Sequence, residues 1–291
     1  MKIGIGLPNV TPGTDGPTIV GWAKRAEHLG FDALAVIDRM AYDSYEPLVA
    51  LAMAAAVTQH VELVTNVIIA PARNTTLLAK QAASLDRASG GRLTLGLAVG
   101  VREDDFAVCG LSPRDRGRML DAQLHELRRL WAVAGGPGQV GPAPARTGGP
   151  RLLIGGAAEH AGRRAAEHGD GWTMMIGSPD EFAAGYAQAR AAWASAGRAG
   201  DPAGMAVFYA ALGDDAHGLA AKAITSYYGW LGDEIVGHIT ASVACDAAAV
   251  AERIEAFGAA GAGEVVVVPC SSAPGQLELL AAAALRRPAL V

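Results

Sequence analysis

VELVTNVII, residues 61–69, is a mostly apolar run rich in β-branched side chains. Such a run is typical of a strand in a parallel sheet whose two faces are both covered. A helical pattern follows at residues 75–89 and ends at Gly90-Gly91, and a further strand pattern occupies residues 93–99. A strand, a helix and a second strand in this order predict a parallel βαβ unit.

The same alternation continues in both directions along the chain. Strand patterns lie at residues 2–7, 32–38, 61–69, 93–99, 151–154, 172–176, 205–212 and 264–269. Helical patterns lie at residues 18–29, 47–58, 75–89, 114–133, 159–168, 179–196, 216–231, 247–260 and 275–285, and residues 134–150 are predicted as a Gly- and Pro-rich loop or short hairpin. We therefore expect residues 1–291 to form one α/β domain, a (β/α)8 TIM barrel. An open doubly wound sheet is the alternative, but no strand is followed by its G-x-G-x-x-G fingerprint.

Composition excludes several classes of protein. Of 291 residues, 51% are hydrophobic and 18% charged, which excludes a disordered chain. The net charge of -5 offers no basic field for nucleic acid or for an anionic membrane surface. Cys109, Cys245 and Cys270 are too widely spaced for a disulfide framework, and the N-terminus lacks a signal peptide. We expect a cytoplasmic protein that binds neither nucleic acid nor membrane.

The carboxyl ends of the strands form the functional face of such a barrel. At one of them, Ile154-Gly155-Gly156-Ala157-Ala158 passes directly from a strand into a helix. Small residues at a helix start let backbone N–H groups approach an anion such as a phosphate, and a plain tight turn is the alternative. At another end, Asn66-Val67 closes an apolar strand, either as part of a site or because the amide satisfies the strand end.

A third candidate is the carboxylate cluster Glu103, Asp104 and Asp105, which follows Arg102. These side chains could bind a metal or transfer protons, but acidic residues are also typical of a helix start. The seven histidines are scattered, with no H-x-x-x-H metal pair and no G-x-S-x-G nucleophile motif. We assign no metal site and no catalytic residue. Tyr227, Tyr228 and Trp230 either form a substrate wall or pack against a neighbouring helix.

Several blocks resemble the luciferase-like monooxygenase superfamily, most closely its branch of oxidoreductases that use the deazaflavin coenzyme F420. The blocks are AKRAEHLGFDALAVID (23–38), LLAKQAASLDRASGGRLTLGLAVG (77–100), DDFAVCGLSPRDRGRMLDAQLHELRRLW (104–131), LLIGGAAEHAGRRAAEHGDGW (152–172) and AAAVAERIEAFGAAGAGEVVVVP (247–269). The resemblance implies a (β/α)8 barrel, usually a homodimer, with the cofactor ring over the strand ends.

The resemblance also implies roles for individual residues. It places a non-prolyl cis peptide at Asn66-Val67 against the ring and the phosphate at Gly155, Gly156, Ala157 and Ala158. It matches Asp38, Gly100, Val101 and Asp104 to positions that line the ring or the ribityl chain. Two departures stand out: Arg39 replaces a common His, and Val101 replaces the acidic residue of sugar-phosphate-oxidising members. Arg39 could contact a small-molecule substrate but cannot act as a general acid.

These observations favour a flavin-type oxidoreductase that transfers hydride between coenzyme F420 and a small organic substrate. An FMN-dependent monooxygenase is the alternative. A non-catalytic flavin-binding barrel is a third, and a metal-dependent lyase or aldolase using Glu103, Asp104 or Asp105 is a fourth. The sequence does not identify the substrate.

Overall fold

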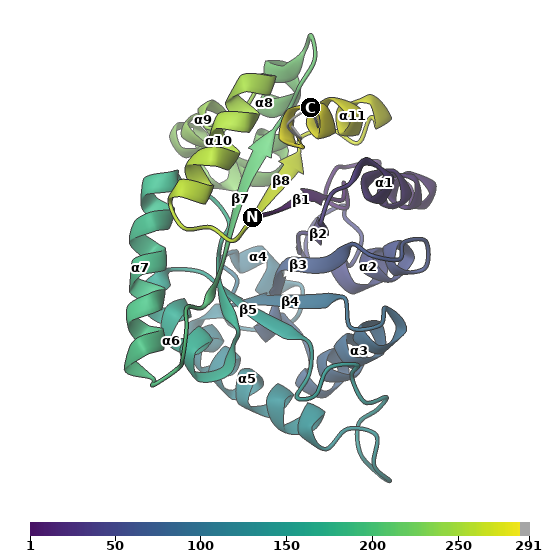
Figure 1. The fold of residues 1–291 in the computed structure, drawn as a ribbon, viewed down its shortest axis with the longest axis vertical. Coiled ribbons are helices and arrows are strands. Elements are labelled where there is room, and N and C mark those ends of the chain that lie inside the picture. Colours follow the sequence, from purple (N-terminus) through teal and green to yellow (C-terminus); the bar gives the residue numbers. More distant parts are fainter. Residues whose placement is uncertain (286–291) are drawn as a thin grey trace, which may run out of the picture.

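Each strand pairs in parallel with the next one along the chain, and the last strand pairs with the first (Figure 1). The structure is a computed structural model that describes residues 1–285. The strands are β1 (Lys2–Gly6), β2 (Ala33–Val36), β3 (Glu62–Ile69), β4 (Leu93–Ala98), β5 (Arg151–Gly155), β6 (Gly171–Met174), β7 (Ala203–Ala210) and β8 (Glu264–Pro269). The closed ring confirms the predicted TIM barrel, because an open sheet would leave two edges unpaired.

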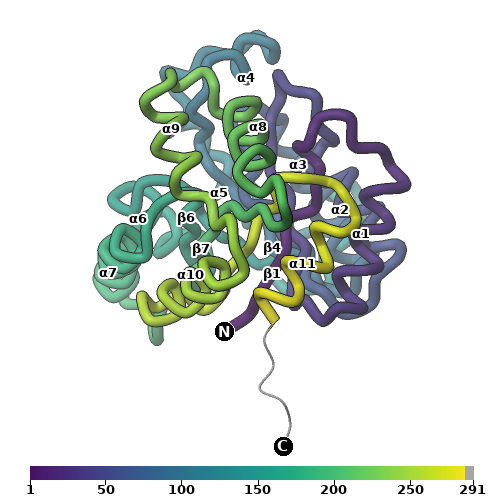
Figure 2. Tube along the Cα trace, turned by 90° about the horizontal axis from the view of Figure 1, so that it is seen from above, coloured from purple at the N-terminus to yellow at the C-terminus, as the bar shows by residue number. Residues whose placement is uncertain are grey.

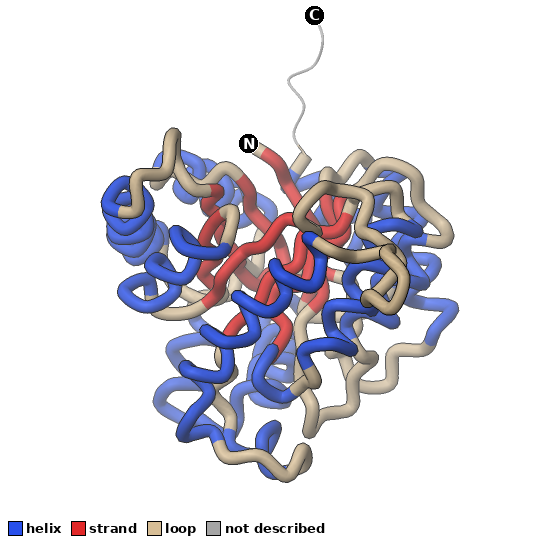
Figure 3. The backbone as a smooth tube through the Cα atoms, turned by 90° about the horizontal axis from the view of Figure 1, so that it is seen from below, coloured by secondary structure: helices blue, strands red, loops and turns tan. Residues whose placement is uncertain are grey.

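The helices surround this ring of strands (Figure 3). They are α1 (Gly16–Leu29), α2 (Pro47–Ala55), α3 (Thr75–Ala88), α4 (Glu103–Ala107), α5 (Arg116–Ala132), α6 (Ala158–His168), α7 (Pro179–Ser195), α8 (Ala216–Tyr228), α9 (Asp233–Ala241), α10 (Ala247–Ala259) and α11 (Pro274–Ala284). Short 3-10 turns occupy Ala70–Ala72, Pro113–Asp115 and Gly229–Leu231. Within residues 1–285, none of the helices has the length and apolar character needed to cross a membrane.

Three segments differ from the sequence-based prediction. The helix expected at 114–133 begins two residues later, at Arg116, because Pro113 starts a separate 3-10 turn before α5. The helix expected at 216–231 ends as an α-helix at Tyr228. An additional helix, α9, follows Gly232, whose positive φ of 86° changes the direction of the chain. Residues 134–150 contain no strand, so the hairpin alternative for this segment was wrong.

Side chains of each strand alternate between the barrel interior and the helical layer. On β2, Ala33 and Ala35 belong to the interior cluster, whereas Leu34 and Val36 pack against the surrounding helices. The same alternation fills both faces of the other strands with buried apolar residues. This accounts for the nearly continuous hydrophobic strand patterns, since neither face of the sheet meets water.

The loops that follow the strands gather at one end of the barrel. Figure 2 shows α4, α8 and α9 at this end and the N-terminus at the other. Two of these helices are connected through Arg102, which directly precedes α4 and donates from Nη1 to the carbonyl oxygen of Tyr227 on α8 at 3.1 Å. The additional helices therefore wall in the space above the strand ends.

Candidate active site

A cavity of about 780 Å³ opens at the carboxyl ends of the strands. The sequence-predicted residues in its wall are Asp38, Arg39, Asn66, Val67, Gly100, Val101, Gly155, Gly156, Ala157 and Ala158. Its other walls include large apolar side chains, among them Trp172, Met174, Ile176, Tyr228 and Trp230. The structure thus brings residues at the carboxyl ends of β2 to β6 and residues at the end of α8 to one hollow.

The floor of the cavity is the end of β3. The Asn66–Val67 peptide bond is cis, as the family resemblance implied. The Asn66 side chain is buried, where its Oδ1 accepts a hydrogen bond from Thr173 Oγ1 at 3.2 Å. The Val67 side chain lies against Gly155 so closely that a Cβ there would come within 2.9 Å of Val67 Cγ1. A glycine at 155 therefore lets β3 and β5 approach beneath the cavity.

The turn from β5 into α6 presents unpaired backbone donors. Gly156 has a φ of 124°, a conformation that favours glycine, and its carbonyl oxygen accepts a hydrogen bond from Trp172 Nε1 at 2.9 Å. Ala157 is the N-cap of α6 and provides no side-chain cap. The first-turn N–H groups of a helix lack intrahelical acceptors, and the helix dipole adds positive potential there. This turn can therefore hold an anion such as a phosphate.

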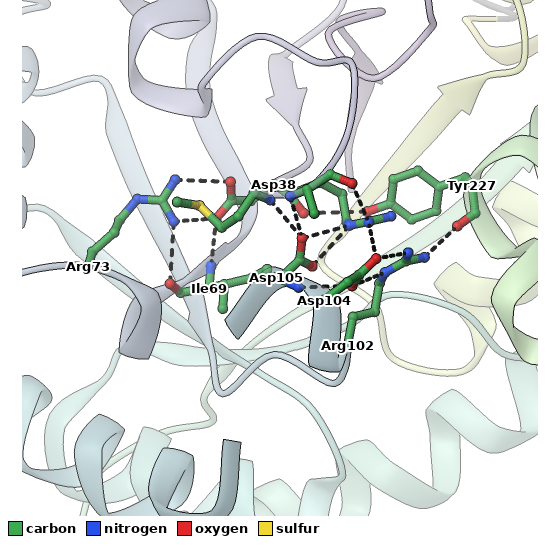
Figure 4. Close-up of polar contacts among 10 residues, drawn as sticks. Asp38, Ile69, Arg73, Arg102, Asp104, Asp105 and Tyr227 are labelled. Atoms are coloured by element: carbon green, nitrogen blue, oxygen red, sulfur yellow. Dashed lines mark hydrogen bonds and ion pairs between the residues drawn. The ribbon is translucent and has the colours of Figure 1, made fainter. Parts of the chain in front are cut away.

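Asp38, two residues after the end of β2, lies in the cavity wall, but its carboxylate is bound by other residues of the protein. Its carboxylate is fully buried and accepts bonds from two nitrogens of Arg73, while the backbone N–H of Ile69 donates to it at 2.8 Å (Figure 4). Glu46 is a second carboxylate partner of Arg73, at 3.2 Å. Asp38 thus fixes the loops after β2 and β3, and its carboxylate is saturated by protein donors.

Arg39 is buried beside Asp105. Its Nε lies 2.9 Å from Asp105 Oδ2, and its Nη2 donates to the carbonyl oxygen of Ala41 at 3.1 Å. The guanidinium lies 5.0 Å from the ring centroid of Tyr42 and 5.4 Å from that of Tyr227. Nη1 is buried and finds no hydrogen-bond acceptor among residues 1–285. The side chain therefore keeps one unsatisfied donor at the cavity wall.

Asp104 is the predicted cofactor residue that does not line the cavity. Its carboxylate is 44% exposed and pairs with Arg102, a contact that lowers its pKa (Figure 4). The physical reason is that α4 begins at Glu103, so successive carboxylates point in different directions around the helix. Asp105, one residue later, faces the cavity instead. The acidic cluster is the helix start that its composition suggested.

A wall of tyrosines closes the side nearest α8. Tyr227 and Tyr228 both line the cavity, in agreement with the substrate-wall interpretation of this segment, and their contact with a substrate stays a prediction. The Tyr228 hydroxyl lies 3.0 Å from that of Tyr209, and burial raises the pKa of Tyr228 to about 12. Burial also raises the pKa of Tyr227 well above its usual range. Both hydroxyls therefore stay protonated at neutral pH and act as hydrogen-bond donors or acceptors, not as bases.

The cavity wall contains no histidine among its residues. In the part of the chain from residue 1 to 285, no three His, Cys, Asp or Glu side chains are grouped closely enough to hold a metal ion. Within the wall Arg39 pairs with Asp105, whereas Asp38 and Arg102 pair with Arg73 and Asp104, which lie outside it. Glu159 and Glu181 also line the cavity, and among the described residues neither forms an ion pair. The chemistry that this geometry supports is the positioning and electrostatic stabilisation of a bound small molecule.

Sequence reasoning missed several residues of the site. No sequence pattern indicated a role for Arg73, because its partner Asp38 lies 35 positions away, in a different loop. Trp172 was read as a strand residue, and its role in holding the Gly156 carbonyl depends on how β5 and β6 pair. Ala184 and Gln188 lie on the inner side of α7, a helix with weak amphipathic character, and no local pattern marks them.

Comparison with known proteins agrees with this architecture. A model of the family described as luciferase-like monooxygenase matches residues 1–266. The uncharacterized proteins Rv0953c and Rv0940c of Mycobacterium tuberculosis are each 30% identical to this chain. The first alignment covers 54% of this chain and 59% of that protein, and the second 58% and 69%. The chain thus spans about three fifths of the length of the first relative.

Solved structures share the fold over nearly the whole chain. The monooxygenase RslO1 from Streptomyces bottropensis superposes with a TM-score of 0.76 at 22% identity, over 98% of this chain and 99% of that one. An F420-dependent secondary alcohol dehydrogenase, in complex with an F420-acetone adduct, gives 0.79 at 18% identity over the same shares. At these identities the likeness is one of fold.

Proposed function

The chain belongs to the luciferase-like monooxygenase family, and from that premise we propose that it is an F420-dependent oxidoreductase acting on a small organic substrate. The observation that carries the proposal is the shape of the cavity. It runs from the apolar floor at Val67 to the uncapped start of α6 at Ala157. A ring with a phosphate-bearing chain needs both features in one hollow.

The residues present fit such a coenzyme. Gly155, Gly156, Ala157 and Ala158 have no long side chains that would keep a phosphate from the backbone N–H groups of α6. Trp172 holds the Gly156 carbonyl oxygen, which fixes the turn before a ligand arrives. Gly100 has a φ of 73° and brings the loop after β4 against Ile69 and Phe106. These residues would hold the phosphate and frame the ring.

The coenzyme, when bound, would supply hydride transfer, and the protein would supply position and electrostatics. The apolar walls would exclude water from the reacting atoms. The Nη1 donor of Arg39 is buried, so it would reach a substrate oxygen after the neighbouring Tyr227 ring moves, and the charge of Arg39 is balanced by Asp105. It would stabilise developing negative charge without transferring a proton, because a guanidinium stays protonated.

One feature favours the deazaflavin over FMN. Ala184, Gly185 and Gln188 of α7 also line the cavity, next to the start of α6. FMN ends at its phosphate, whereas the deazaflavin carries further groups beyond it. The part of the wall that α7 forms would give those groups a place.

Another feature favours the alternative, an FMN-dependent monooxygenase. Glu159 and Glu181 line the same end of the cavity, where they would repel the acidic groups of a deazaflavin tail. A terminal phosphate on the α6 amides would extend less far toward them. The Glu181 carboxylate is partly occupied, since it accepts a hydrogen bond from the Ser178 N–H at 2.7 Å.

Titration of the purified protein with each coenzyme, oxidised and reduced, tests the proposal. We expect micromolar binding of F420, followed by its fluorescence, and binding of FMN at least ten-fold weaker. The reverse order would replace the proposal with the FMN-dependent alternative. Tight binding of either coenzyme without turnover of any carbonyl or alcohol in a broad panel would favour the non-catalytic barrel.

We also propose that the chain forms a homodimer, as the family resemblance implied. Val49 on α2 and Leu77 on α3 are each 53% exposed, and these two helices contact each other. Together they offer apolar surface on one side of the barrel. Light scattering should give about twice the mass of one chain, and V49E with L77E should reduce it to one.

A further inference from the structure

A second cavity of about 280 Å³ lies at the ends of β1, β7 and β8. Tyr227 is the residue that its wall shares with the first cavity. The Tyr227 hydroxyl is held by a long contact of 3.4 Å to the carbonyl oxygen of Asp38. The two cavities are therefore neighbours, and the Tyr227 side chain lies between them.

The wall of this second cavity is rich in donors. It contains Lys222 together with the hydroxyl residues Thr11, Ser226, Ser271 and Ser272, and it contains no Asp or Glu. Lys222 is an exposed residue of α8, and among the described residues it forms no ion pair, so its charge is solvated and not neutralised by the protein. An acceptor with a single negative charge matches this set of groups.

One thiol and two phenols in the wall of the second cavity stay neutral because burial raises their pKa. Burial raises the pKa of the Cys270 thiol to about 12, and it raises the pKa of Tyr209 and of Tyr227 well above their usual range. None of these side chains would carry a negative charge near pH 7. Lys222 is therefore the charged side chain in the wall of the second cavity.

The first cavity differs in chemistry. Where it meets Tyr227, its charged residues are already paired, Arg39 with Asp105 and Arg102 with Asp104. Much of the rest of its wall is apolar and includes Met174, Ile176 and Trp230. The side chains of Ile176 and Trp230 are 37% and 45% exposed. An uncharged organic group fits this lining better than a second ion would.

We propose that the second cavity binds the carboxylate of the substrate, and that the uncharged part of the same substrate lies in the first cavity. The substrate is then an organic acid, and Tyr227 swings aside to let it span both hollows. This inference rests on the proposed function, because it takes the first cavity as the place of reaction. One lysine matches the single charge of a carboxylate better than a doubly charged phosphate.

The test uses the coenzyme-free protein and the probes 3-phenylpropanoate and its neutral amide. We expect calorimetry to give at least ten-fold tighter binding of the acid than of the amide. K222M should remove that preference, and K24M, which changes an exposed lysine on α1, should retain it. Equal binding of acid and amide, or an unchanged preference in K222M, would overturn the carboxylate site whatever the coenzyme titration gives.

A second measurement tests whether the ligand spans both cavities. In protein labelled at the methionine methyl groups, 5-phenylpentanoate should shift the Met174 signal by ring-current effects, whereas acetate should leave it in place. Y227A should strengthen binding of the long acid, because it removes the partition. A long acid that binds through Lys222 without shifting Met174 would overturn the substrate assignment and leave an isolated anion site.

Discussion

Arg39 and Asp105 form a buried ion pair, with Nε 2.9 Å from Oδ2 and side chains that are 2% and 1% exposed. The backbone N–H groups of Met40 and Ala41 donate to the same carboxylate, each at 2.8 Å. The pair joins the loop after β2 to α4, which follows β4. Two loops at the mouth of the cavity are thereby fixed to each other without a regular element between them.

Asp105→Leu should lower the free energy of unfolding by about 3–5 kcal/mol, because it leaves the buried Nε of Arg39 and two backbone N–H groups without their acceptor. Arg39→Met should cost less, since the carboxylate keeps the two N–H donors. The double variant should cost clearly less than the sum of the two, which a double-mutant cycle in urea would measure. Additive costs would mean that the pair contributes no coupling.

Ala157→Asp should separate anion binding from stability. An Asp at the N-cap of α6 would accept from the first-turn N–H groups and should stabilise the fold by about 0.5–2 kcal/mol. The same carboxylate would occupy the donors proposed for the phosphate and repel it. We therefore expect a higher melting temperature together with at least ten-fold weaker coenzyme binding.

Ala157→Ser is the matched control for charge. It should cap the helix to a similar degree, and it should weaken coenzyme binding less than the Asp variant does. If Ala157→Asp stabilised the protein and left coenzyme affinity unchanged, the α6 turn would not be the phosphate site.

Much of the architecture could be predicted from the sequence because it depends on local patterns. The strand at residues 61–69 is apolar on both faces, and Gly30 ends α1 as predicted, with a φ of 97°. The glycine turn at Gly155 and Gly156 is also local, because a strand passes there directly into a helix. Each of these features needs information from only one stretch of chain.

The hydrogen-bond and ion-pair partners within the site could not be predicted in the same way. Arg73 reaches Asp38 across two loops, and Asp105, not Asp104, turns inward because α4 begins at Glu103. A shift of one residue on a helix rotates a side chain by about 100°, and sequence alone does not set the helix start to that precision. Contacts between loops depend on closure of the barrel, which brings distant strand ends together.

Tyr228→Phe should change the alkaline stability of the protein. Burial raises the pKa of Tyr228 from the ordinary tyrosine value of 10.0 to about 12. Between these values the unfolded chain loses its phenolic proton while the folded chain keeps it, so stability falls as pH rises from 10 to 12. The loss from this one group is about 3 kcal/mol at most. Tyr228→Phe should make the decline shallower, which unfolding at several pH values would measure.

Absorbance at alkaline pH gives an independent check of the same group. Tyr228→Phe should remove one tyrosinate signal that appears near pH 12 or with unfolding, and should leave the signals of exposed tyrosines in place. An ordinary titration of all six tyrosines near pH 10 in the folded protein would contradict the buried environment.

Gly155→Ala tests the close approach of β3 and β5 at the cavity floor. The added Cβ would lie 2.9 Å from Val67 Cγ1, so Val67 must move, and we expect a loss of about 1–3 kcal/mol in the free energy of unfolding. Val67→Ala removes the atom that clashes, so Gly155→Ala combined with Val67→Ala should be more stable than Gly155→Ala alone. Coenzyme fluorescence should report weaker binding in Gly155→Ala and partial recovery in the pair. A double variant no more stable than Gly155→Ala would show that the glycine is needed for another reason than contact with Val67.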